Sequence, residues 1–218
     1  MAVEIRSFHG DTSSVADLAR ETFQAAMHDD PVARYLVKDT SYRRFWDVMI
    51  SHYLTPTHSD LNFITEGCKA GMLARIYPDE QASALSEVAH AVRLLPTFPL
   101  TKIWSALMIN DAMDRGTAAF GKEHGSYIYV FLLGTRPECQ GQGLGSALMS
   151  HLNSIADARG MHSYLESSSE GSRRFYKRHG YVDRQTYKMA PDAPPLFLMS
   201  RAPKNQPTST GQNGGASI

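Results

Sequence analysis

Three glycines at alternate positions mark the stretch of this sequence that is best suited to chemistry. They lie between an apolar run and a run with helical periodicity, in the segment Gln140, Gly141, Gln142, Gly143, Leu144, Gly145 and Ser146. The start of a helix presents unpaired backbone N–H groups and a partial positive charge, which suits a phosphate. Glycine permits positive φ and has no Cβ to keep an anion away from those N–H groups. The segment therefore predicts a phosphate site built from backbone rather than from lysine side chains.

Spacing excludes two common phosphate-binding loops. The dinucleotide fingerprint G-x-G-x-x-G would need a glycine where this chain has Ser146, and the pattern G-x-x-x-x-G-K-[ST] is absent from the sequence. What remains matches the pattern Q/R-x-x-G-x-G/A. A glycine-rich structural turn would give the same six letters, so the flanking elements must decide between the two interpretations.

The elements beside the loop are a strand and a helix. Residues Tyr127 to Leu133 are seven consecutive apolar residues, rich in β-branched and aromatic types and followed by Gly134, which predicts a buried central strand that ends at that glycine. After the loop, apolar residues share one helical face up to Gly160. The glycine loop is therefore expected between the end of a central strand and the start of a helix.

The remaining pattern predicts a mixed α/β chain. Further strands are expected at 3–8, 62–65, 69–76, 164–166, 181–188 and 195–201. Helices are expected from Ser13 to about Asp29, at 42–53, at 173–179, and as a pair within 79–119 that is interrupted at 95–99. We expect one domain over 1–203, with 79–119 as a helical insertion. The polar tail, 204–218, is expected to be disordered.

Composition argues against several classes of partner. The 218 residues carry 22 Lys and Arg against 22 Asp and Glu, so no excess charge favours nucleic acid or an anionic membrane. Two distant cysteines and an N-terminus without a signal-like apolar stretch favour a cytoplasmic protein. The nine histidines are scattered without a ligand spacing such as H-E-x-x-H, so no metal site is predicted.

Two motifs in order resemble the GNAT superfamily of acetyl-CoA-dependent N-acetyltransferases. Residues 140–145 are similar to its pyrophosphate-binding motif, and 132–138 resemble the approach to that motif, with Thr135 where Val or Ile is usual. Downstream, Leu165-Glu166-Ser167-Ser168 followed by 174–181 (R-F-Y-K-R-H-G-Y) resembles the second half of the family pattern. Two motifs in order are harder to obtain by chance than one. This run and 195–201 look most like fungal and bacterial small-molecule acetyltransferases of the puromycin acetyltransferase type.

The resemblance implies a fold and a binding mode, with 127–190 as the cofactor-binding core. The expected fold is a GNAT-like twisted mixed sheet of about seven strands with helices on both faces and a splayed central strand pair that admits acetyl-CoA. Backbone N–H groups of Leu133, Gly134 and Thr135 would pair with the pantetheine arm and polarise the thioester carbonyl. The glycine loop would hold the diphosphate, and Phe175 and Tyr176 would border the thioester.

Tyr176 is the residue that the resemblance places near the sulfur of the coenzyme, where it would donate a proton to the departing thiolate. The alternative is an ordinary amphipathic tyrosine whose ring packs on the sheet.

A general base is also needed, because an amine with a pKa near 10 is only about a thousandth deprotonated at pH 7. Glu166, at the end of a strand beside the expected cleft, is the candidate, and the alternative is a structural ion pair with Arg173 or Arg174. Glu123 and His124 are further candidates.

Basic residues cluster at Arg173, Arg174, Lys177 and Arg178. Such a run is usually a solvated helix face. The functional hypothesis is that it binds the 3′-phosphate of CoA. Arg136 is another candidate for that contact.

The function expected from the sequence is transfer of an acetyl group from acetyl-CoA to a primary amine of a small molecule, by direct attack in a ternary complex. The acceptor would bind between the N-terminal helices and the 79–119 insertion. A protein or peptide acetyltransferase is the alternative within enzymes, and a non-catalytic acyl-CoA sensor is the alternative outside them. The sequence leaves the oligomeric state and the length of the acyl group open.

Overall fold

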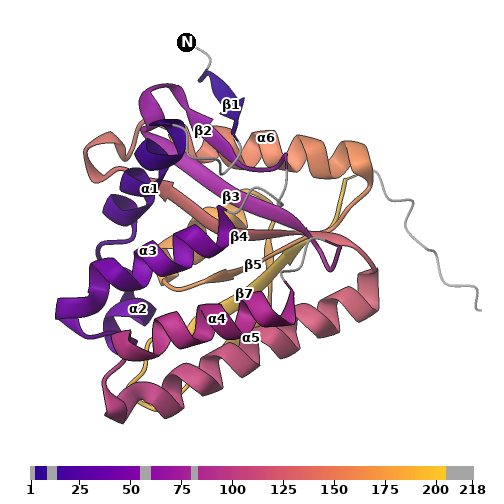
Figure 1. The fold of residues 1–218 in the computed structure, drawn as a ribbon. Helices are drawn as coiled ribbons and strands as arrows, with labels where there is room; N and C mark the ends of the chain where they lie inside the picture. The colour runs from indigo at the N-terminus through magenta and orange to yellow at the C-terminus, as the bar shows by residue number, and fades with distance from the viewer. Residues whose placement is uncertain (1–2, 9–13, 55–59, 80–82, 205–218) are drawn as a thin grey trace, which may run out of the picture.

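The computed structural model describes residues 3–8, 14–54, 60–79 and 83–204. At its centre is a seven-stranded sheet in the order β1-β2-β3-β4-β5-β7-β6 (Figure 1). The strands are β1 Ile5–Ser7, β2 Phe63–Thr65, β3 Ala70–Tyr77, β4 Tyr127–Thr135, β5 Ser163–Ser167, β6 Val182–Tyr187 and β7 Leu196–Arg201. β4 and β5 are parallel, whereas the other neighbouring strands of the sheet are antiparallel. The expected mixed sheet of about seven strands is confirmed. Of the tail expected to be disordered, all but Lys204 lies outside the described residues.

Helices cover both faces of the sheet, as predicted (Figure 1). One hydrophobic core joins the sheet to helices from the first part of the chain and contains Phe23 and Phe120. These helices are α1 Ser14–Ala26, α2 Pro31–Leu36, α3 Tyr42–Tyr53, α4 Ala84–Leu94 and α5 Ile103–His124. A second core on the other face contains Leu148 and Tyr176, from α6 Leu144–Arg159 and α7 Glu170–Arg178.

No helix within the described residues has both the length and the apolar character needed to cross a lipid bilayer.

The helix boundaries follow the local signals, with one helix that the sequence analysis missed. The expected helix at 42–53 and the pair within 79–119 are present, although α5 continues to His124. α2 was not predicted, yet its start has both usual signals: Asp30 Oδ1 accepts a hydrogen bond from Ala33 N at 2.8 Å, and Pro31 occupies the first turn. The segment was interpreted only as the end of the preceding helix.

A β-bulge in β4 opens the centre of the sheet. Leu132 pairs with Leu73 of β3 and Val130 pairs with Ala74, so Phe131 is an extra residue in β4. Pairing between β4 and β5 stops at the same level, with Val130 opposite Leu165. Beyond it, β5 continues against β7 and β4 continues against β3. The predicted splay of the central strand pair is therefore confirmed. The bulge bends β4 at the point where β4 and β5 begin to separate.

Glycines allow α1 to approach this bent strand. We expected β4 to end at Gly134, but it runs on to Thr135, with Gly134 paired to Gly71 of β3. A Cβ on Gly134 would lie 2.7 Å from the Cβ of Ala26, and one on Gly71 would lie 2.8 Å from Cζ of Phe23. The two glycines are explained by this close helix–sheet contact and not by a strand terminus.

Substitution of Gly134 tests this contact. Gly134→Ala should lower the free energy of unfolding by about 1–3 kcal/mol, because the Cβ of Ala26 is fixed to the backbone and the whole helix must move. Urea denaturation measures the loss. As the matched control, an added Cβ at Gly171 in α7 would meet only Ser169 Oγ at 3.7 Å, so Gly171→Ala should be neutral or stabilise by up to about 1 kcal/mol. Equal destabilisation by both substitutions would contradict the explanation.

Candidate active site

A groove with a volume of ≈ 510 Å³ lies where β4 ends and where α6 and α7 present side chains to it. It is lined by the end of α1, the end of β4, the glycine loop and α7. Most of the residues predicted to bind the coenzyme come together here: Leu133, Gly134, Thr135, Gln140, Gly141, Gly143, Leu144, Gly145, Ser146, Phe175 and Tyr176. Gln142 and Glu166 are not among the lining residues. Ala26 and Met27 were missed, since only the tertiary fold brings the end of α1 to this place.

The glycine loop leaves the start of α6 open to an anion. Gly141 and Gly143 have φ of 77° and 79°, and a Cβ on either would have no atom within 4 Å. They are therefore required for backbone conformation rather than for lack of space. Gly143 is the N-cap of α6 and supplies no side-chain acceptor, and the first turn carries no acidic residue. The first N–H groups of α6 are thus available to a bound anion.

Hydrogen bonds and a side-chain contact hold the loop in place. Gln140 Nε2 donates to the carbonyl oxygen of Thr135 at 3.4 Å, and Cys139 N donates to the carbonyl oxygen of Arg136 at 2.9 Å. Ser146 Oγ lies 3.2 Å from Nε2 of His179, which follows α7. His179 was not a predicted site residue. The contact joins the start of α6 to the end of α7, the two helices that border the groove.

Tyr176 is held in a position that keeps its phenol protonated. It lies on α7, whose first turn is capped by Ser169 through a 3.1 Å hydrogen bond from Ser172 N. Its side chain lines the groove and is 8% exposed. Burial, with a smaller contribution from Tyr181, raises the pKa of the Tyr176 phenol above its usual value. At neutral pH the group therefore carries the proton that a donor needs.

Glu166 points to the opposite face of the sheet. Its neighbour Leu165 is in the core shared with α6 and α7, and the hydroxyl of Tyr129, from the other core, donates to Glu166 Oε2 at 2.8 Å. Oε1 is buried and has no hydrogen-bond partner among the described residues. Burial raises the pKa of the Glu166 carboxyl to about 7. A carboxyl with this pKa can exchange a proton near neutral pH.

Arg173, one of the two arginines in the structural alternative for Glu166, is paired with other carboxylates. Arg173 bonds Asp183 at 2.8 Å and Glu170 at 3.0 Å, and Lys177 bonds Asp183 at 2.6 Å. The two cations lower the pKa of the Asp183 carboxyl, with the hydrogen bond from Arg173 as the largest cause. Within the basic cluster, Arg178 is the residue that lines the groove.

Arg136 does not lie in the groove. Its Nε donates to Thr22 Oγ1 at 2.9 Å, and its Nη2 lies 3.7 Å from a carboxylate oxygen of Glu21. These contacts tie the end of β4 to α1. Arg136, the other candidate for the 3′-phosphate, therefore contacts α1 and does not line the groove.

The other candidate bases lie at the far end of β4. Glu123 bonds Arg184, and His124 stacks on His162 with ring centroids 4.0 Å apart. Arg184 lies over the ring of Phe120, 5.2 Å from its centroid, and that ring packs against Tyr127, the first residue of β4. The groove, in contrast, is formed by the last three residues of β4. Glu123 and His124 are not brought to the groove.

Asp30 and Ser168 form a contact that the sequence analysis missed. The hydroxyl of Ser168, two residues beyond Glu166, donates to Asp30 Oδ2. The other oxygen of Asp30 caps α2. The bond joins the start of α2 to the end of β5, beside the gap between the central strands.

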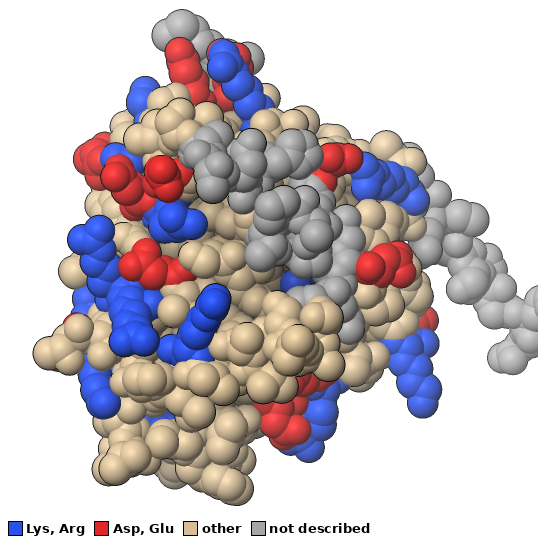
Figure 2. All heavy atoms as spheres, in the orientation of Figure 1, with Lys and Arg blue, Asp and Glu red and all other residues tan. Residues whose placement is uncertain are grey.

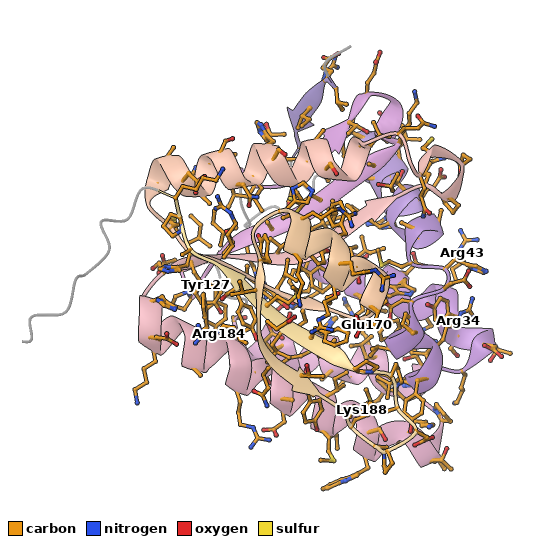
Figure 3. The ribbon with its side chains drawn as sticks, turned by 180° about the vertical axis from the view of Figure 1, so that it is seen from behind. Arg34, Arg43, Tyr127, Glu170, Arg184 and Lys188 are labelled. Atoms are coloured by element: carbon orange, nitrogen blue, oxygen red, sulfur yellow. The ribbon has the colours of Figure 1, made fainter. Side chains whose placement is uncertain are left out.

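A second groove of ≈ 450 Å³ lies among α1, α2 and α3, and its lining includes Arg34 and Arg43 (Figure 3). It contains none of the predicted site residues. Within the described residues, no group of three or more His, Cys, Asp or Glu side chains is arranged to hold a metal ion.

Comparison with known proteins agrees with this geometry. Residues 101–183 match the family model described as acetyltransferase (GNAT) domain. An uncharacterized N-acetyltransferase of Schizosaccharomyces pombe is 25% identical over 197 residues, which cover 86% of this chain and 80% of that protein.

Solved structures share the fold at low identity. A crystal structure described as histone acetyltransferase HPA2 and related acetyltransferase from Corynebacterium glutamicum has a TM-score of 0.61 at 17% identity, covering 95% of this chain and 99% of that one. The polyamine N-acetyltransferase of Drosophila melanogaster has a TM-score of 0.63 at 16% identity, covering 92% and 99%. Residues 101–183 therefore match a GNAT acetyltransferase domain, and the chain has the GNAT fold.

Proposed function

We propose that this protein transfers an acetyl group from acetyl-CoA to a primary amine of a small molecule. The observation that carries the proposal is one continuous arrangement. The open start of α6 borders a groove that contains Tyr176, and this groove adjoins the gap between β4 and β5, with Glu166 on the opposite face of the sheet.

The residues of the groove fit the coenzyme. Uncapped N–H groups at the start of α6 and the glycines before it suit a diphosphate. Beyond Val130, the edge of β4 that faces β5 has no strand partner, so its N–H and C=O groups are available to the amides of a pantetheine arm. Acetyl-CoA would supply the activated acyl group and a thiolate leaving group.

The two candidate catalytic groups would act from opposite sides of the gap. The Glu166 carboxylate, once ionised above about pH 7, would accept the proton of the attacking ammonium, directly or through water. The Tyr176 phenol, protonated at neutral pH, would donate a proton to the thiolate. Their pKa values differ in the direction that an acid and a base of one reaction need.

Burial of the base favours a small acceptor. Glu166 Oε1 is buried, and the residue as a whole is only partly exposed. Next to it, α5 packs so closely that a Cβ on Gly116 would lie 2.5 Å from the hydroxyl of Tyr164. A slender amine reaches such a group more readily than the side chain of a folded protein does. Among structures with this fold are an arylalkylamine N-acetyltransferase of Aedes aegypti and the ribosomal-protein-S18-alanine N-acetyltransferase of Escherichia coli, so the fold by itself does not select the acceptor.

The proposal includes a cytoplasmic location, which is supported by the free state of both cysteines, Cys68 and Cys139.

An amine panel tests the function as a whole. We expect CoA release with at least one of aminonucleosides, polyamines, aminoglycosides and amino acids, and little with peptides. Faster turnover of peptides would favour the protein acetyltransferase. If CoA raised the melting temperature while no amine was acetylated, a non-catalytic sensor would replace the enzyme.

Tyr176→Phe tests the proton donor. We expect kcat to fall tenfold to a thousandfold, because the thiolate loses its acid, while the affinity for CoA and the melting temperature stay unchanged. Single-turnover kinetics measures the rate of acetyl transfer, and calorimetric titration measures the affinity for CoA. Tyr181→Phe is the control: Tyr181 has its ring centroid 5.8 Å from that of Tyr176 but does not line the groove. Full activity of Tyr176→Phe would remove the role.

The pH profile tests the base. We expect kcat/KM to fall as pH decreases through about 7, because protonation of Glu166 removes the proton acceptor. Glu166→Gln should abolish this limb and lower the rate about a hundredfold. Tyr129→Phe should move the limb to higher pH, because the hydrogen bond from Tyr129 favours the ionised carboxylate. An unchanged limb in Glu166→Gln would assign the titration to another group.

Arg178→Ala tests the contact with the 3′-phosphate. We expect about a five- to tenfold loss of affinity for CoA and no loss for dephospho-CoA, which lacks that phosphate. Arg174→Ala is the control, since Arg174 is exposed on the same helix and does not line the groove. An equal loss for both ligands would show that Arg178 acts through packing on Phe175 instead.

A further inference from the structure

Helix α4 has no buried residue. It spans 11 residues, Ala84–Leu94, and every side chain is exposed or only partly covered. A helix of this length is marginal in water by itself and gains its stability from burying an apolar face. The first half of α5 is similar. Three of the 22 residues of α5 are buried, and only Ile109 is in the first half; Thr117 and Phe120 are in the second.

The apolar face of α4 is turned to solvent. Leu85, Val88 and Val92, with Leu95 just after the helix, recur at the spacing of one helical stripe and are 80%, 60%, 60% and 47% exposed. His90 lies on the other side of the helix and stacks on His52 of α3, with ring centroids 4.0 Å apart. The helix therefore contacts the protein through the side that carries His90 and Leu94, and it presents the stripe of Leu85, Val88 and Val92 outward.

A second exposed apolar stripe lies on and before α5. Leu100, Trp104, Leu107 and Met108 are 87%, 72%, 55% and 36% exposed. Figure 2 shows the lower part of the molecule, where α4 and α5 lie in Figure 1, as mostly uncharged surface. We call these eight residues the α4–α5 face. Side chains exposed to these fractions present on the order of 800 Å² of mainly apolar surface in total.

We propose that the α4–α5 face is the interface of a homodimer, in which α4 packs antiparallel against α4 of a second copy about a two-fold axis at the level of His90. The stripe is symmetric about that residue: Leu85 and Leu95 lie five positions on either side, and Val88 and Val92 lie two. An antiparallel two-fold pair places Val88 at the level of Val92 of the partner subunit, so the same stripe is its own complement.

Charge and area both favour a second copy over another partner. The stripe itself carries no charged residue. Beside it, Glu87 lies 3.2 Å from His52 and Asp111 is paired with Arg115, while Arg93 is exposed and has no ion pair among the described residues. A single exposed cation offers little to a charged partner, whereas the apolar stripe is its own complement. The area corresponds to one subunit's share of a standard protein interface, about 800 Å². The inference does not depend on the catalytic proposal.

Sedimentation velocity of the full chain at about 1 to 100 μM tests the dimer. We expect a species of twice the 24.2 kDa chain mass, with dissociation as the concentration falls. A chain that stayed monomeric throughout this range would overturn the proposal.

Paired charges test the register. Val88→Glu with Val92→Glu places like charges at the same level across the axis and should weaken the dimer at least about a hundredfold. Val88→Glu with Val92→Lys places opposite charges there and should restore most of the affinity. Both positions are 60% exposed in the monomer, so circular dichroism should show an unchanged fold.

Val182→Glu is the matched control, since Val182 of β6 is 61% exposed and lies outside the α4–α5 face. It should leave the dimer intact. A dimer that survived Val88→Glu with Val92→Glu would place the interface elsewhere and overturn the proposal. Equal weakening by the two charge pairs would exclude the antiparallel register and overturn it as well.

Discussion

The structure depends on one interruption of backbone pairing. β4 stays in the sheet because it pairs with β3 along its whole length, whereas its pairing with β5 stops about halfway along. The extra residue Phe131 achieves both, because the bulge bends the strand just where the last pair, Val130 with Leu165, is made. A regular β4 would continue against β5, close the gap and bury the backbone groups that a coenzyme would need. The groove, the glycine loop and both candidate catalytic groups are arranged around this gap.

Glycine serves two separate purposes around the bent strand. Gly71 and Gly134 remove side chains where α1 must approach the sheet, and their φ values are ordinary for strands. Gly141 and Gly143 have ample room but adopt positive φ. The first pair sets the position of one wall of the groove, and the second pair sets the direction of the N–H groups at the start of α6. In sequence the two kinds of glycine look alike.

The site carries an electrostatic cost that a structural core would avoid. Burying Glu166 raises its pKa to about 7, so ionising it in the folded state near neutral pH opposes stability. The protonated Glu166 carboxyl therefore contributes to the stability of the fold. This contribution is fully present below the pKa that Glu166 has in the unfolded chain, and it is lost as pH rises through about 7. The hydrogen bond from Tyr129 is the largest contribution that offsets this cost, and Oε1 has no hydrogen-bond partner among the described residues. Such an unsatisfied group at the edge of a gap is typical of a functional site rather than of a packed interior.

The sequence by itself determined the elements with strong local signals. The central strand, the glycine loop and the following helix were all predictable, because apolar run length, glycine spacing and helical periodicity act over neighbouring residues. Only the tertiary structure decided which side chains meet. Glu166 and Tyr176 lie on opposite faces because strand alternation and helix docking combine over distant segments, and Arg136 is engaged by α1 while Arg178 reaches the groove. The outward turn of the apolar side of α4 likewise depends on where the helix docks, which no local pattern records.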